Sequence, residues 1–134
     1  MKKISLSGQN PIQIKLAARL EQLNEVILNA IQDVKAIDVV KLDLTNIPDA
    51  GAQFFFICHG NSTTHVAGII DSVQRKVQDL MGIQPNHVEG KEGRQWMLVD
   101  YFSTLVHVFT PDKRFYYNLE QLWSDAVVTK YESQ

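Results

Sequence analysis

The clearest hydrophobic pattern in the chain is a helical one near its start. Apolar residues recur at steps of three and four from Leu16 to Val34, with polar residues off this stripe. The spacing predicts an amphipathic helix that ends near Lys35. Asn10 before Pro11 is a suitable cap for this helix, but a start near Leu16 fits the pattern equally well.

The next two segments have patterns typical of strands. Residues 37–44 have a period of two. It puts Val40, Leu42 and Leu44 on one face of a strand, and the other face has Val39, Lys41 and Asp43. Residues 54–58 are an unbroken apolar run rich in phenylalanine, as expected of a strand covered on both faces. We therefore expect residues 54–58 in the middle of a sheet.

A second helical pattern follows the turn residues 60–62. Ser62 has a side chain preferred at helix N-caps, and Gly82 stands where the pattern stops, as glycine commonly does after a helix. The pattern predicts a helix between these two residues. Its buried stripe is expected to be Val66, Ile69 or Ile70, Val73, Val77 and Leu80.

The last third of the chain returns to strands and ends in a helix. The patterns predict strands at residues 86–89, 95–101 and 104–110, the last two joined as a hairpin. Its turn, Phe102 and Ser103, lacks the glycine or asparagine that two-residue turns favour. A short C-terminal helix is indicated by Leu119, Leu122 and Trp123.

Together these elements have the order α-β-β-α-β-β-β-α. They predict an α/β (α+β) fold, a mixed sheet of about five strands flanked by helices. The 134 residues suit one domain. We expect that domain at residues 13–126, a loose N-terminal arm at 1–12 and a C-terminal tail at 127–134.

Composition narrows the classes of function. Thirteen Lys and Arg against fifteen Asp and Glu give a net charge of -2, so we expect little direct nucleic-acid contact. No apolar run reaches the roughly 18 residues of a membrane span, which favours a cytoplasmic protein without a membrane partner. The single cysteine, Cys58, and the dispersed histidines have no metal-ligand spacing, so we expect no metal and no other cofactor.

The turn Gly60-Asn61-Ser62 admits two interpretations. The first is a helix cap. The second is an anion site like that of a nucleotidyltransferase, which also needs a pair of strand carboxylates to hold magnesium. Asp43 stands alone on its strand and no Asp-x-Asp occurs, so the sequence favours the cap and a protein that is not an enzyme.

The strand around Trp96 divides into two faces. Trp96, Leu98 and Asp100 share one face by parity, and Met97, Val99 and Tyr101 share the other. Tryptophan and tyrosine are favoured interface anchors, so residues 89–101 are the best candidate for a partner surface, although ordinary sheet packing explains them equally well. A second set is interpreted as a clasp that holds the last helix on the sheet: Arg114, Tyr116, Tyr117, Glu120 and Trp123.

Six motifs in register resemble one family, the Iojap-like ribosomal silencing factors, from about Leu23 to Ala126. The motifs are Lys35-Ala36 with Asp38-Val39-Val40, Phe55-Phe56-Ile57 with Gly60-Asn61-Ser62, Val88-Glu89-Gly90, Trp96-Met97-Leu98-Val99-Asp100-Tyr101, Val106-His107-Val108-Phe109, and residues 114–123.

This resemblance implies both a fold and a function. The fold would be similar to a nucleotidyltransferase core without its catalysis. The function would be to bind the large ribosomal subunit through the fourteenth protein of its series, at the intersubunit face, and so to block association of the two subunits and repress translation. An assembly factor of the large subunit that uses the same surface remains the alternative. Members are often homodimers in isolation.

Carried over by position, the resemblance assigns the partner contact to six residues: Trp96, Met97, Asp100, Tyr101, Glu89 and Gly90. The acidic members would complement a basic ribosomal protein. Two departures from the family stand out. Many relatives have Asp where this chain has Gln53, and Gly-Asp where it has Phe102-Ser103. The second departure alters the hairpin tip.

Overall fold

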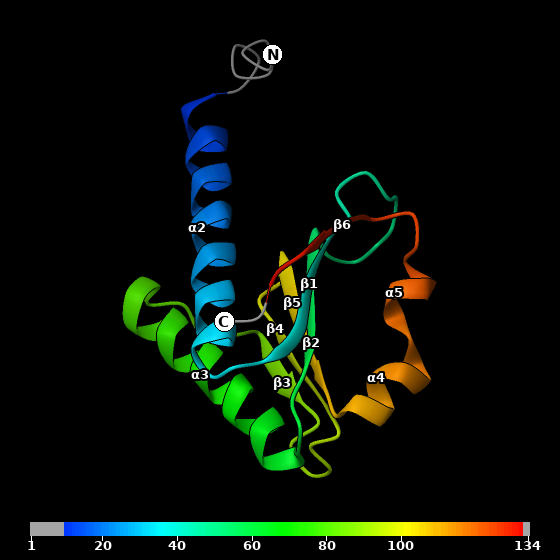
Figure 1. Ribbon diagram of the computed structural model, residues 1–134. Coiled ribbons are helices and arrows are strands. Elements are labelled where there is room, and N and C mark those ends of the chain that lie inside the picture. The colour runs from blue at the N-terminus through cyan, green and yellow to red at the C-terminus, as the bar shows by residue number, and fades with distance from the viewer. Residues whose placement is uncertain (1–9, 133–134) are drawn as a thin grey trace.

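Two long helices cover one face of a mixed, six-stranded sheet in an α+β arrangement (Figure 1). The computed structural model describes residues 10–132. Its elements are α2 (Pro11–Asp33), β1 (Ile37–Asp43), β2 (Phe54–His59), α3 (Thr63–Met81), β3 (His87–Glu89), β4 (Trp96–Asp100), β5 (Thr104–Phe109), α4 (Pro111–Tyr117), α5 (Leu119–Leu122) and β6 (Val127–Lys130).

Both predicted helix caps are present, and each has a local cause. Asn10 and Gln13 form a reciprocal capping box, so α2 begins at Pro11 and not near Leu16. Two residues of the predicted arm are therefore helical, and residues 1–9 lie outside the described part of the chain. Ser62 caps α3, and Gly82 ends it with a φ of 67°.

The strands are ordered β3-β4-β5-β2-β1-β6, with β2 and β5 parallel and the other pairs antiparallel. The apolar run of β2 is central, as predicted. The sheet was expected to have about five strands. It has six, because Val127–Lys130 pairs with β1 in a segment that was predicted to be a tail.

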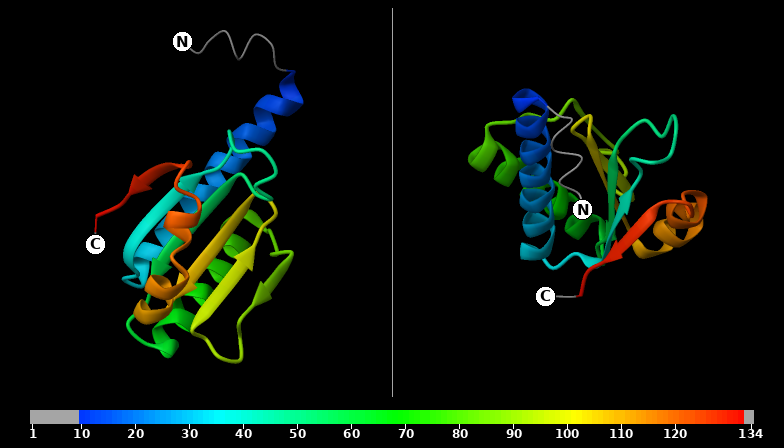
Figure 2. Two further views of the ribbon diagram at one scale, coloured as in Figure 1. Left: turned by 90° about the vertical axis from the view of Figure 1, so that its right-hand side faces the viewer. Right: turned by 90° about the horizontal axis from the view of Figure 1, so that it is seen from above.

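Apolar side chains pack on both faces of the sheet. The helix-side core, between the sheet and α2 and α3, contains Ile27, Val73, Met97 and Val99. On the opposite face, Leu42 and Phe109 belong to a smaller core under α4 and α5 (Figure 2, left).

Two expectations for the helices are wrong in detail. Leu80 is 65% exposed and Met81 is buried in its place, because a step of four from Val77 falls on residue 81. The C-terminal helix is two short helices, since Asn118 has a φ of 47° and interrupts the helical backbone.

Candidate docking surface

Part of the sheet face opposite α2 and α3 has no helix over it. The left view of Figure 2 looks onto this face: α4 and α5 cross it over β1, β2 and β5, and leave β3 and β4 open. We call the side chains on this part of the sheet the open face. They are His87 and Glu89 from β3, and Trp96, Leu98 and Asp100 from β4, brought together by the antiparallel pairing of the two strands. Trp96, at the edge of the open face, also contacts Tyr117 of α4.

Trp96 is the rigid anchor of the open face. Its ring stacks on Phe109 at a centroid distance of 5.0 Å and lies 4.5 Å from the ring of Tyr117. Its indole Nε1 donates a hydrogen bond of 3.1 Å to Nδ1 of His107. Trp96 therefore packs on the sheet, as one of its two interpretations predicts, and it remains partly exposed.

His107 is a buried, neutral support for Trp96. Burial lowers the pKa of its imidazole from 6.5 to about 4. Because Nδ1 accepts the hydrogen bond from Trp96, the ring proton is on Nε2, which has no partner among the described residues.

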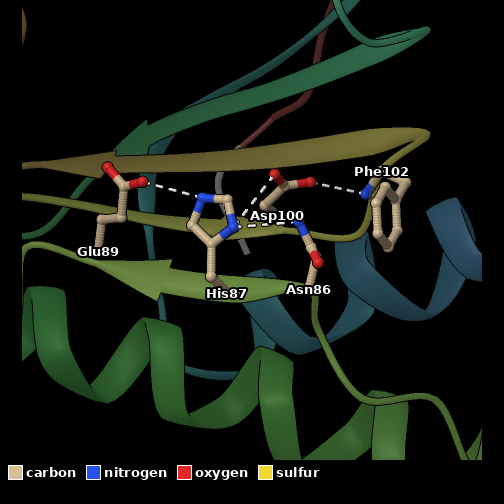
Figure 3. A network of polar contacts seen from close by, with 5 residues as sticks. All are labelled: Asn86, His87, Glu89, Asp100 and Phe102. Carbon is tan, nitrogen blue, oxygen red and sulfur yellow. Dashed lines mark hydrogen bonds and ion pairs between the residues drawn. The ribbon is translucent and has the colours of Figure 1, made fainter.

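The opposite end of the open face is polar and acidic (Figure 3). The His87 ring lies between two carboxylates, with Nε2 at 2.9 Å from Glu89 and Nδ1 at 3.6 Å from Asp100. The Glu89 side chain is 62% exposed, whereas that of Asp100 is 16% exposed. Glu89 is thus the carboxylate most available to a partner.

Asp100 also stabilises the hairpin turn that the sequence left unexplained. Its Oδ1 accepts a hydrogen bond of 2.7 Å from the backbone N–H of Phe102, as Figure 3 shows. This bond supports Phe102 at a φ of 69°, a conformation that favours glycine. A glycine would suit this backbone directly, and here Phe102 adopts it with its ring exposed.

Three of the six carried-over residues do not offer side chains to a partner. Met97 and Tyr101 point toward α2 and α3 and are buried in the helix-side core, because alternate residues of β4 face opposite sides. Gly90 has a φ of 89°, and a Cβ there would lie 2.1 Å from the carbonyl oxygen of Trp96. Gly90 therefore lets the β3–β4 loop pass close to Trp96.

The turn at residues 60–62 satisfies its own polar groups. Ser62 Oγ accepts the backbone N–H of His65, and His65 Nδ1 accepts that of Asn61. The other ring nitrogen of His65 donates to the carbonyl of Val34 at 2.7 Å, which ties the turn to the end of α2. These contacts agree with the helix cap, and they occupy the backbone N–H groups of Asn61 and His65 that an anion would need.

The predicted clasp holds α4 and α5 through a nearly buried guanidinium. Arg114 donates to Glu120 at 2.7 Å, to the carbonyl of Ile37 and to His59. Tyr117 adds packing against Trp96. Tyr116, the remaining tyrosine of the predicted set, is 75% exposed and does not contribute to the sheet contact.

Three further properties of residues 10–132 concern metal ligands, the cysteine thiol and membrane-spanning helices. They contain no group of three or more His, Cys, Asp or Glu placed to hold a metal ion. Burial raises the pKa of the Cys58 thiol to about 12, which keeps it protonated near neutral pH. No described helix has the length and apolar character needed to cross a bilayer.

Two open-face residues were missed by the sequence prediction. His87 and Leu98 lie beside Glu89 and Asp100, but neither was singled out as a contact. The alternation of β4 already placed Leu98 with Trp96, and the pairing of β3 with β4 adds His87. The available signal was parity along the strand rather than residue type.

Comparisons with known proteins find ribosomal silencing factors among the similar sequences. The family described as "Ribosomal silencing factor during starvation" matches residues 17–134. Similar proteins include the ribosomal silencing factor RsfS of Halalkalibacterium halodurans, 41% identical over 84% of this chain and 94% of the relative. The RsfS of Bacillus subtilis is 43% identical over 72% of this chain and 80% of its own.

A mitochondrial protein and a solved structure are also similar to this chain. "Mitochondrial assembly of ribosomal large subunit protein 1" of Mus musculus is 32% identical over 54% of this chain and 32% of its own. A crystal structure of a Chromobacterium violaceum protein superposes with a TM-score of 0.73 at 32% identity, covering 78% of this chain and 85% of the other.

Proposed function

Because this chain belongs to the RsfS family of ribosomal silencing factors, we propose that its open face docks on the large ribosomal subunit and blocks joining of the small subunit. The family name indicates a ribosome-associated regulator rather than an enzyme. The observation that carries the proposal is a sheet face left uncovered around a rigid tryptophan. A partly exposed aromatic anchor of this kind is typical of interface centres.

We assign the contact on the subunit to a basic protein, the fourteenth of the large-subunit series. Glu89 presents an exposed carboxylate at one end of the open face, with the charge of Asp100 beside it. Complementary charge would steer a basic partner to this end of the face. Leu98 and Trp96 would then form the apolar centre of the contact.

Binding is tested by co-sedimentation with purified large and small subunits. The informative variant is Glu89→Arg with Leu98→Ser, which changes the open face without removing Trp96 from its packing. Its matched control, Asp79→Arg with Leu80→Ser, also replaces one acidic residue by arginine and one leucine by serine, at exposed positions of α3. We expect the first variant to bind the large subunit at least about tenfold more weakly and the control to bind normally. Equal binding by the two variants would remove the open face as the docking site.

Silencing and assembly differ in what binding does to mature subunits. The name of the mouse relative supports the assembly alternative. In a sucrose-gradient assay, a silencing factor reduces the amount of joined ribosomes as protein is added to mature subunits. Unchanged joining despite binding, together with immature large subunits in cells that lack the protein, would favour assembly.

Two finer expectations belong to the same proposal. A homodimer whose interface includes the open face would compete with docking, so added large subunits should convert dimer to subunit-bound monomer in analytical ultracentrifugation. A protein that acts on ribosomes would work in the cytoplasm.

A further inference from the structure

A second, basic surface lies next to the open face. The loop between β3 and β4, residues 90–95, and helix α4 come together at one end of the sheet, the lower end in the left view of Figure 2. They enclose a hollow of about 210 Å³. The residues that line it include Gly93, Arg94, Gln95, Trp96, Lys113 and Tyr117.

Three cationic side chains lie at this corner. Arg94 and Lys113 line the hollow from opposite elements, and Lys91 stands on the same loop as Arg94. Arg94 has a φ of 57°, and its Nε donates to the carbonyl of Lys91 at 3.3 Å, which holds the guanidinium close to the loop. Within residues 10–132, none of these three cations forms an ion pair.

Acidic side chains also lie near this corner. Asp112 precedes Lys113 in α4 and accepts a hydrogen bond of 2.8 Å from Thr110 Oγ. Glu92 is exposed on the loop itself. Glu89 precedes the loop, and Asp71, which lies beside Lys91 and Arg94, is paired with Arg75. Three cations thus face three acids, Glu89, Glu92 and Asp112, so what the corner offers an anion is cations that form no ion pair rather than an excess of positive charge.

Aromatic rings adjoin the cations. Trp96 and Tyr117 form one wall of the hollow. The 75% exposed ring of Tyr116 lies beside them, with Lys113 Nζ at 5.8 Å from its centre. Unpaired cations next to exposed aromatic rings are the combination with which proteins hold the phosphates and bases of single-stranded RNA.

We propose that this basic corner, made of Lys91, Arg94, Lys113 and Tyr116, binds the phosphate backbone of a short stretch of ribosomal RNA. The inference rests on the proposed docking, because the anionic component of a ribosomal surface is its RNA. The acidic end of the open face and the basic corner would then contact a basic protein and the adjoining RNA together. This is a small local contact, in keeping with the negative net charge.

The first test is an anisotropy titration of the full chain with a short fluorescein-labelled poly-uridine strand at several salt concentrations. Lys91→Glu with Lys113→Glu should weaken binding at least about tenfold and flatten the log–log salt dependence by about 0.7 for each phosphate that the variant no longer neutralises. The control, Lys15→Glu with Lys130→Glu, makes the same change in net charge at exposed positions elsewhere and should retain binding. Glu92→Gln should tighten binding.

Several results would overturn the inference: no binding by the natural chain at low salt, equal loss of binding in the control, or equal competition by polyglutamate, which would indicate an acidic protein as ligand. Co-sedimentation with the large subunit separates this inference from the proposed function. If the natural chain and both lysine variants bind the subunit equally, the RNA contact is wrong and docking stands. If the natural chain does not bind the subunit, docking itself is wrong.

Discussion

A single buried histidine should make the stability of this protein depend on pH. Burial lowers the pKa of His107 to about 4, whereas an unfolded chain has a histidine pKa near 6.5. Between these values the unfolded state binds a proton that the folded state does not. The free energy of unfolding should therefore fall as the pH drops through this window, by up to about 3 kcal/mol from this residue.

The measurement is urea unfolding at a series of pH values, comparing the natural chain with His107→Gln. Glutamine can accept the Trp96 hydrogen bond but does not titrate. His59, whose pKa is also lowered, is present in both proteins, so the difference between the two profiles isolates His107. Parallel profiles would show that His107 is not the group responsible.

At the scale of elements, the conformation of the β3–β4 loop requires glycine at position 90 but not at position 93. A Cβ at Gly90 would meet the Trp96 carbonyl, and its φ of 89° is unfavourable for any other residue. Gly90→Ala should thus lower the free energy of unfolding by on the order of 2 kcal/mol. Gly93→Ala is the control, since a Cβ there has nothing within 4 Å and the backbone is not left-handed.

Thermal unfolding with both alanine variants checks this expectation, and amide hydrogen exchange locates the effect. We expect faster exchange in β3 and the start of β4 for Gly90→Ala only. Equal stability of the two variants would mean that the loop can move away from Trp96 at little cost.

At the scale of the whole molecule, β6 protects the edge of the sheet. It covers the β1 segment Val40–Asp43, and the Tyr131 backbone N–H donates to the Val39 carbonyl. A chain that ends at Ala126 would expose the backbone groups of β1, including those of buried Leu42. We expect it to be less stable and to self-associate through this edge.

Sedimentation velocity and urea unfolding measure both effects. The control is a chain shortened only by residues 133–134, which should remain as stable as the natural chain. An unchanged sedimentation coefficient and unchanged stability after removal of residues 127–134 would show that β6 is dispensable.

Elements whose causes are local could be predicted from the sequence. Apolar patterns located both long helices and five of the six strands, and the side chain of Ser62 marked the start of α3. For α2 the sequence left two starts open, and the structure has the one at Asn10. Parity along β4 also placed Trp96 and Asp100 on one face and Met97 and Tyr101 on the other.

Features that depend on pairing or packing between distant segments could not be predicted from the sequence. All four residues of β6 are exposed, so their side chains contain no burial pattern and the strand exists through its hydrogen bonds with β1. Which face of β4 stays open was decided by α2 and α3, which cover Met97 and Tyr101, and by α4 and α5, which stop short of β3. The local pattern of a strand shows that successive side chains point to opposite faces of the sheet. Which of the two faces a partner can reach depends on the helices that cover the sheet, and these come from distant parts of the chain.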